Sequence, residues 1–261
     1  MQLDSERLKT YLERLDYDRS PVVSPESLRD LQLAHLLTVP FENLSIHAHE
    51  AIVLSDEALY AKIVERRRGG FCYELNGLFA CLLRTVGFHV EMLSARVADS
   101  EGNFSADFDH MTLVVKLDQN WLVDVGFGDS FREPLLLAAG LEQEQGTEGF
   151  RLVHDEPQWT LFRRKRSEEW LPQYQFTLQP YNYADYEERC WYQQTSPESH
   201  FTKGRMCSRA TPEGRITLSE MRFITTSLSG ERDERTLDNA AEYTLFLKEQ
   251  FGIVMRQETG A

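Results

Sequence analysis

Hydrophobic residues recur every three or four positions through the first third of the chain, which is the spacing of one face of an α-helix. Leu8, Leu12 and Leu15 show this pattern near the N-terminus. Ser24-Pro25 is typical of a second helix start, because proline fits the first helical turn. Glycine is typical of helix ends, where the backbone often turns left-handed. The predicted helices begin near Ser5, Ser24, Ser55 and Cys72, and the last two end at Gly69-Gly70 and Gly87.

From Phe88 onward the pattern changes to short runs rich in valine, leucine and aromatic residues, which are typical of β-strands. These runs predict an antiparallel sheet or small barrel that ends near Pro180. A short strand pair and a closing helix over residues 237–251 are expected after it. The predicted strands lie within residues 88–97, 110–117, 120–127, 150–153, 159–164, 174–178, 206–218 and 221–228. Helices followed by strands indicate an α+β fold without the βαβ alternation of a dinucleotide-binding fold.

Composition and charge narrow the class of protein. The chain has 261 residues, of which 41% are hydrophobic and 27% are charged, and this composition is typical of a globular protein. A formal net charge of -14 argues against a nucleic-acid partner, because phosphate binding needs clustered basic residues. The charged, amphipathic N-terminus resembles neither a signal peptide nor a membrane span, so we expect a cytoplasmic protein with no membrane partner.

The cysteines and histidines give no sign of a metal site. Four cysteines occur without CxxC spacing, so neither disulfides nor a structural zinc site is expected. The segment His47-Ala48-His49-Glu50 lacks the second histidine of an HExxH helix, and we interpret it as a polar loop. The chain also lacks GxSxG, P-loop and GxGxxG motifs. No metal cofactor is therefore predicted.

The segment RRRGGFCYELNGLF, residues 66–79, places Cys72 where a helix is expected to begin. Unpaired backbone N–H groups and the positive end of the helix dipole favour a thiolate at such a position. The alternative is a small buried hydrophobe, which is the interpretation that we give to Cys81 inside the apolar helix. Cys72 is therefore the candidate nucleophile.

His110 and Asp124 are the candidate base and orienting carboxylate for that nucleophile. Asp124 interrupts the apolar strand WLVDVGF, and a buried carboxylate needs a partner. A tight turn at Gln119-Asn120 would place Asp124 opposite Val115, about 16 Å along the strand from His110. The simplest hairpin therefore separates the pair, and a different register is needed to bring the two side chains together.

Five segments match one family in sequence order: VPFENLSIH (39–47), RRGGFCYELNGLF (67–79), DHMTLVV (109–115), WLVDVGFGDSF (121–131) and TSPESHFTKG (195–204). On these segments the chain resembles the arylamine N-acetyltransferases, which are called N-hydroxyarylamine O-acetyltransferases in bacteria. The resemblance implies a helical bundle carrying the nucleophile (1–87), an antiparallel β-barrel carrying the histidine and aspartate (88–190) and an α/β lid (191–261). It also implies a papain-like arrangement of Cys72, His110 and Asp124.

The family chemistry implied for this chain is a ping-pong transfer of acetyl from acetyl-CoA, through acetyl-Cys72, to an arylamine, arylhydrazine or N-hydroxyarylamine. The resemblance assigns acceptor contacts to Phe127, Asp129 and Phe131, for which ordinary packing of the two aromatic rings is the alternative. An acid at Asp129 is expected to disfavour anionic acceptors such as aminobenzoates. Family contacts with CoA map onto Ala106, Asp107, Tyr192, Ser196, Phe201 and Thr202. Asp107 departs from the family pattern, because a carboxylate near pyrophosphate is unfavourable unless only its backbone is used.

Arg68 is predicted to be structural, held by Glu42 or Asn43 of the PFEN loop. Two other classes of function stay open at this point: a papain-like or transglutaminase-like hydrolase using the same three residues, and a noncatalytic scaffold with a packed Cys72. A different acyl donor or an intramolecular amide-forming role is also compatible with the sequence. The natural acceptor, the preferred acyl chain, the binding mode of CoA and the oligomeric state do not follow from the sequence.

Overall fold

The structure, a computed structural model, describes residues 2–165 and 168–255. Polar residues cap the N-termini of several helices: Asp4, Ser24 and Ser55 each accept a backbone N–H. The helices are α1 (Ser5–Arg14), α2 (Pro25–Thr38), α3 (Leu44–His47), α4 (Asp56–Tyr60), the π-helix η1 (Ala61–Glu65), α5 (Cys72–Val86), α6 (Tyr183–Thr195), α7 (His200–Lys203) and α8 (Ala240–Phe251). The predicted helix starts are thus confirmed.

Eight antiparallel strands form a nearly closed barrel in the order β5-β4-β3-β2-β9-β8-β7-β6. The strands are β2 (His89–Val97), β3 (His110–Lys116), β4 (Asn120–Val123), β5 (Leu135–Leu136), β6 (Glu142–Gln145), β7 (Glu148–Asp155), β8 (Gln158–Lys165) and β9 (Leu171–Tyr181). The side chain of Gln143 bridges the seam, because it exchanges hydrogen bonds of 2.7 and 3.0 Å with the backbone of Leu136. The barrel expected from the sequence is confirmed.

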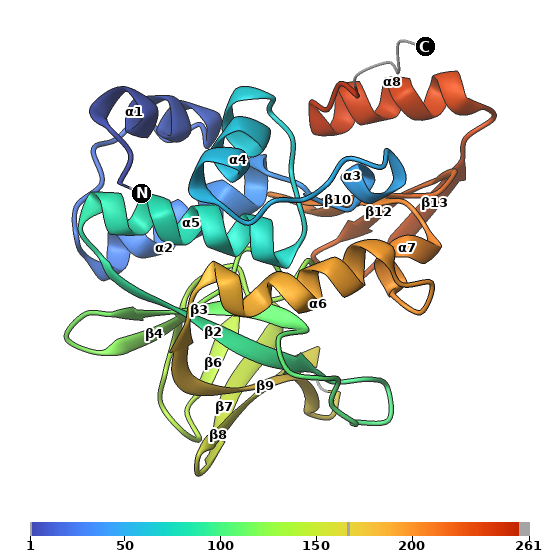
Figure 1. Ribbon diagram of the computed structural model, residues 1–261. Coiled ribbons are helices and arrows are strands. Elements are labelled where there is room, and N and C mark those ends of the chain that lie inside the picture. Colours follow the sequence, from blue (N-terminus) through green and yellow to red (C-terminus); the bar gives the residue numbers. More distant parts are fainter. Residues whose placement is uncertain (1, 166–167, 256–261) are drawn as a thin grey trace.

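A second sheet of five strands joins the N-terminal and C-terminal parts of the chain. Its strands are β1 (Phe41–Glu42), β10 (Met206–Thr211), β11 (Gly214–Ser219), β12 (Arg222–Ser227) and β13 (Arg232–Thr236). Strand β1 pairs with β10, with Phe41 opposite Ser208. The PFEN loop is therefore fastened to the lid sheet, and α8 packs on the same sheet (Figure 1).

Helix α5 lies between the helical part and the barrel (Figure 1). Its residues from Cys72 to Leu83 are all buried, and they share one core with α1, α2 and the facing residues of β2 and β3. A separate core fills the barrel, and a third lies beneath α8. The nucleophile-bearing helix is thus held on several sides by packed side chains.

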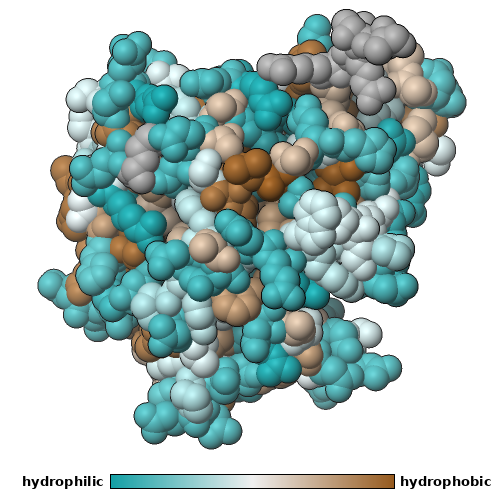
Figure 2. Space-filling view, viewed as in Figure 1, coloured by the Kyte–Doolittle hydropathy of each residue, from teal (hydrophilic) through white to brown (hydrophobic). Residues whose placement is uncertain are grey.

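Helix α6 was not assigned from the sequence, and it runs through residues 190 and 191, where the second predicted domain boundary falls. The division into 1–87, 88–190 and 191–261 stays a prediction, and residues 256–261 lie outside the described part of the chain. The surface seen in Figure 2 is mostly hydrophilic, with some hydrophobic residues gathered near its middle. Among the described residues, none of the helices has the length and hydropathy that crossing a membrane would require.

Candidate active site

Cys72 is the first residue of α5, as the sequence predicts, and it is 3% exposed. The carboxylate of Glu74 accepts the N–H of Phe71 at 3.1 Å and so satisfies one donor of the helix start. Gly69 and Gly70 precede the helix because neither position has room for a Cβ atom. A Cβ on Gly69 would lie 1.9 Å from the carbonyl oxygen of Pro40.

A buried ion-pair network stabilises the loop that precedes Cys72. Arg68 donates from Nε to Glu42 at 3.0 Å, and Lys62 donates to Glu74 at 2.7 Å. The prediction that Glu42 holds Arg68 is confirmed. Asn43, the alternative partner, instead donates to the carbonyl oxygens of Phe201 and Gly204 and thereby ties the loop to the lid.

His110 and Asp124 are in contact, with 2.7 Å between Nε2 and Oδ2. The predicted tight turn at Gln119-Asn120 is wrong. Lys116 pairs with Asn120 and Val115 with Trp121, so residues 117–119 form the loop. Leu113 therefore lies opposite Val123, which brings Asp124 within reach of His110 farther along the same strand pair. The longer loop moves the register by three positions and removes the 16 Å separation expected from the simplest hairpin.

Asp124 is buried and fully hydrogen-bonded. Burial raises the pKa of its carboxyl, but His110 and the donors of Asn76 and Gly126 outweigh burial and hold that pKa below its ordinary value. Asn76 donates at 2.9 Å and Tyr174 donates at 3.2 Å. Because these donors surround the carboxylate, Asp124 stays ionised and fixes the orientation of the imidazole.

Asn76 and Tyr174 were missed in the sequence analysis. Asn76 carried a readable signal, since it is a polar residue in an apolar helix four positions after Cys72, and residues four apart share a helix face. Its side chain also accepts the N–H of Val125 at 2.9 Å. Tyr174 lies on β9, far from the other residues in sequence, and no local pattern marked it.

Burial raises the pKa of the Cys72 thiol and so opposes the effect expected from the helix start. The backbone N–H of Met111 donates to the sulfur and opposes the effect of burial, whereas the carboxylates of Asp109 and Asp124 add to it. Met111 follows His110 directly in the chain, and Cys72 and His110 line the same cavity. A thiolate here requires proton transfer to that base.

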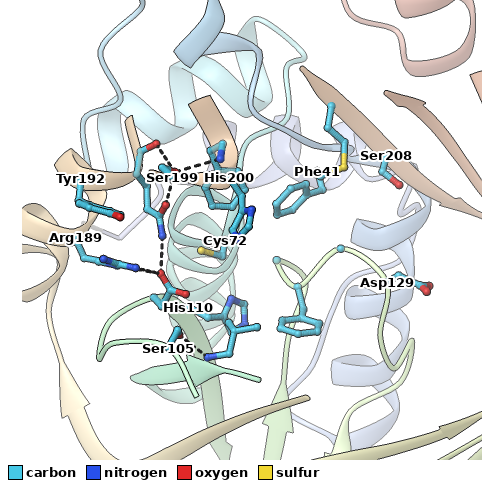
Figure 3. Close-up of a pocket in the computed structure, with 18 of the residues that line it drawn as sticks. Phe41, Cys72, Ser105, His110, Asp129, Arg189, Tyr192, Ser199, His200 and Ser208 are labelled. Carbon is cyan, nitrogen blue, oxygen red and sulfur yellow. Dashed lines mark hydrogen bonds and ion pairs between the residues drawn. The ribbon is translucent and has the colours of Figure 1, made fainter. Parts of the chain in front are cut away.

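The sulfur and the imidazole open into a cavity of about 600 Å³ between the helical part, the barrel and the lid. Figure 3 shows Cys72 and His110 between two groups of lining residues, with Arg189 and Tyr192 on one side and Ser208 and Asp129 on the other. Such a volume is typical of small-molecule sites. The predicted site residues that line the cavity are Cys72, His110, Phe127, Asp129, Tyr192 and Phe201.

Phe127 and Phe131 have different environments. The ring of Phe127 lines the cavity and packs edge-on against His110, with 5.1 Å between ring centroids. Phe131 is 2% exposed and packs against Phe150 in the barrel core. The structure therefore gives Phe131 a packing role in the barrel core, and the contact with the acceptor predicted for it stays a prediction.

The other residues expected to contact CoA lie outside the cavity lining. Asp107 is exposed, with 4.0 Å between its carboxylate and Arg96, and its neighbour Ala106 is also exposed. Thr202 donates to the carbonyl oxygen of Ser196 at 2.7 Å and so stabilises the turn between α6 and α7. The CoA contacts assigned to these four positions, Ala106, Asp107, Ser196 and Thr202, stay predictions.

A family model described as N-acetyltransferase matches residues 25–259 of this chain. With the mixed fold and the cavity described above, this match defines the class of protein as an acyltransferase.

The chain is 37% identical over 250 residues to an arylamine N-acetyltransferase of Mycolicibacterium smegmatis, with 93% of this chain and 90% of that protein covered. The solved arylamine N-acetyltransferase of Salmonella typhimurium superposes with a TM-score of 0.91 at 32% identity, covering 100% of this chain and 96% of that one. The Mycobacterium marinum arylamine N-acetyltransferase in complex with CoA superposes with a TM-score of 0.86 at 33% identity, covering 94% and 92%. The chain therefore belongs to the arylamine N-acetyltransferase family, and acetyl transfer is its activity.

Proposed function

We propose that this protein transfers acetyl from acetyl-CoA to arylamines, arylhydrazines and N-hydroxyarylamines by a ping-pong mechanism through acetyl-Cys72. One observation carries the proposal: the sulfur of Cys72 and the imidazole of His110 line one cavity, and Asp124 orients that imidazole at 2.7 Å. The relative in complex with CoA supports a CoA thioester as the donor.

In the first half-reaction the Cys72 thiol passes its proton to Nδ1 of His110. The other ring nitrogen, Nε2, is hydrogen-bonded to Asp124, so Nδ1 is the one left to accept the proton. The thiolate attacks the thioester carbonyl, and the resulting oxyanion meets the backbone N–H of Cys72, which as the first helical residue lacks an intrahelical acceptor. The bond from carbon to the CoA sulfur then breaks. The CoA thiolate takes the proton from His110 and leaves Cys72 acetylated.

In the second half-reaction the amine of the acceptor attacks the acetyl carbon of Cys72. His110 accepts the proton that the amine loses, and the carbon–sulfur bond of the intermediate breaks as that proton passes to the sulfur. Phe127 stands edge-on against the imidazole, so an aromatic acceptor that contacts Phe127 also lies near the acetylated sulfur. Tyr192 and Phe201 line the cavity from the lid and are the side chains proposed to contact the CoA arm.

The first prediction concerns the intermediate. Incubation with acetyl-CoA should add one acetyl group to Cys72, detected by mass spectrometry of the intact protein and its peptides, and addition of an arylamine should remove it. The Cys72→Ala variant should take up no acetyl group, whereas Cys81→Ala, which changes another buried cysteine of the same helix, should behave as the wild type.

An unmodified Cys72 after incubation with acetyl-CoA would falsify the proposed mechanism. Release of free acetate at the same rate with and without an acceptor would instead indicate a hydrolase. Failure of iodoacetamide to label Cys72 near neutral pH would favour a noncatalytic, packed cysteine.

A further inference from the structure

A second cavity, of about 210 Å³, lies beside the loop that precedes Cys72, residues 66–71. It is bounded by the ends of α1 and α2, this loop, strand β10 and the end of α8, and Figure 1 shows α1 and α8 at the end of the molecule opposite the barrel. Among the described residues it shares no lining residue with the active-site cavity. Its volume is below the range of about 300–1,000 Å³ that is typical of sites for drug-sized molecules, so a small ligand fits it better.

Three arginines from separate parts of the chain line this cavity: Arg14 of α1, Arg67 of the loop and Arg209 of β10. Arg14 is buried and donates to three backbone carbonyl oxygens at 2.9 to 3.3 Å. Arg209 is half-buried and also donates to backbone carbonyl oxygens. A carbonyl oxygen satisfies a donor but carries no net charge. In the part of the chain that the structure describes, none of the three arginines is paired with a carboxylate.

Arg67 is the arginine of this cavity that is free to bind a ligand. It has neither a hydrogen-bond nor an ion-pair partner among residues 2–165 and 168–255. Its φ of 51° lies in the left-handed region, which costs a residue with a Cβ atom about 1–2 kcal/mol. The preceding Arg66 pairs with Glu50 at 3.5 Å and lies outside the cavity lining. The turn therefore places Arg67, and not its neighbour, at the cavity wall.

The charges of these arginines act on one another. Burial lowers the pKa of Arg14 to about 10, and the nearby charge of Arg67 adds to this lowering. Burial also lowers the pKa of Arg209. A ligand with a negative charge would relieve the repulsion between these guanidinium groups.

Two carboxylates, those of Asp16 and Glu249, also line the cavity and oppose an anion. Both residues are exposed, so water screens their charges, whereas Arg14 is buried. Among the described residues the lining therefore has three cations against two screened carboxylates. In a chain with a net charge of -14, arginines that gather around a cavity without carboxylate partners favour an anionic ligand.

We propose that this second cavity binds a small oxyanion of the phosphate or sulfate class, held by charge-assisted hydrogen bonds from Arg14, Arg67 and Arg209. Guanidinium groups present their N–H donors in a fork that matches the oxygen atoms of phosphate. The bound ion connects the loop that precedes Cys72, through Arg67, to the lid sheet, through Arg209. The proposal concerns a site separate from the active-site cavity and does not depend on the proposed acetyl transfer.

The test is isothermal titration calorimetry with inorganic phosphate at constant ionic strength, with no CoA compound present. The wild type should bind one phosphate per chain. Arg67→Met should weaken the affinity about tenfold or more, as expected for loss of a charged hydrogen bond, and Arg67→Lys should recover part of it. The matched control is Arg66→Met, which removes the same charge one position away and should bind phosphate as the wild type does. Because Arg67 is exposed, its variants should unfold at the wild-type urea concentration.

No saturable binding of phosphate by the wild type, or equal affinities in the wild type and Arg67→Met, would overturn the proposal. Phenyl phosphate distinguishes the sources of the oxyanion. Binding tighter than that of inorganic phosphate, with the same dependence on Arg67, assigns the site to a phosphate ester, and weaker binding assigns it to the free ion.

A last comparison separates this site from the binding of the acyl donor. Acetylation of Cys72 by acetyl-CoA and by p-nitrophenyl acetate, a donor without phosphates, should have the same rates in Arg67→Met as in Arg66→Met. A loss in Arg67→Met that is confined to acetyl-CoA would mean that Arg67 contacts the phosphates of the donor, and the proposal of a separate site would be wrong.

Discussion

Asp109 precedes the candidate base, and its carboxylate affects the pKa of the Cys72 thiol more than any other charged side chain, after burial and the N–H of Met111. Its carboxylate raises the pKa of the Cys72 thiol, and it accepts hydrogen bonds from Arg189 at 2.9 Å and Gln193 at 2.6 Å. Arg189 therefore offsets a negative charge that opposes thiolate formation, and it fastens α6 to the cavity wall. The other titratable groups around the sulfur are Asp124, Cys190, His110, Tyr73 and Tyr186.

Loss of the Arg189 charge should make Cys72 less reactive at neutral pH. In Arg189→Met the Asp109 carboxylate is no longer offset, so the pKa of the thiol should rise and alkylation by iodoacetamide at pH 7 should slow about fivefold. The measurement is the pH profile of alkylation. Arg189→Lys should keep the wild-type profile, and the double variant Asp109→Asn, Arg189→Met should return toward it. Identical profiles for wild type and Arg189→Met would show that Arg189 has no electrostatic effect on Cys72.

At the scale of elements, the loop from η1 to α5 determines where the nucleophile lies. Burial raises the pKa of Glu74, whereas Lys62 and Arg68 overcome burial at Glu42 and lower its pKa. Removing one partner of such a network strands a buried charge, which is strongly destabilising. The close approach of Gly69 to the backbone of Pro40, just before β1, also holds the loop in place.

A methyl group on Gly69 should displace the loop. In Gly69→Ala the new Cβ would meet the carbonyl oxygen of Pro40 at 1.9 Å, so either backbone must move. The expected cost is about 1–3 kcal/mol of unfolding free energy, measured by urea denaturation. Acetylation of Cys72 should slow by roughly a hundredfold, because small misplacements of reacting groups are costly.

The matched control for this loop is Gly204→Ala, where a Cβ would meet only the end of the Glu220 side chain at 3.1 Å. That variant should retain both stability and acetylation rate. Wild-type acetylation in Gly69→Ala would mean that the close backbone approach does not position Cys72.

At the scale of the whole molecule, the helical core contains a histidine that must stay neutral. His35 on α2 is fully buried beside Phe79, and neither ring nitrogen has a hydrogen-bond partner among the described residues. Burial, with a smaller effect of the Arg14 charge, lowers the pKa of His35 to about 3. Below pH 6.5 His35 binds a proton in the unfolded chain but stays neutral in the folded chain. The free energy of unfolding therefore falls as the pH falls.

This difference predicts acid sensitivity with a defined sign. Between pH 6.5 and about 3 the free energy of unfolding should fall by about 1.4 kcal/mol per pH unit through His35 alone. Urea denaturation at pH 7 and pH 5 should therefore show a loss about 2 kcal/mol larger in the wild type than in His35→Leu. Tyr60→Phe, which keeps His35, is the control and should show the wild-type loss. Equal losses in wild type and His35→Leu would exclude His35 as the source.

The sequence by itself determined the starts of α1, α2, α4 and α5, the closing helix α8, most strands and the three residues of the candidate site, but not α3, α6 or α7. Capping residues such as Ser24 and terminating glycines such as Gly87 act within one turn, so their effect can be predicted locally. The family segments identified Cys72, His110 and Asp124, because each of these residues lies in a short run of characteristic residues that can be recognised locally.

Only the tertiary structure decided the properties that depend on groups far apart in the chain. The β3–β4 register follows from packing and loop closure. A prediction based on a two-residue turn takes neither into account. The raised pKa of Cys72 depends on burial that no local pattern measures. Phe131 faces the barrel core and Arg215 faces the cavity only because strands from the barrel and the lid meet there. Local capping is short-ranged, whereas burial and charge are summed over the whole fold.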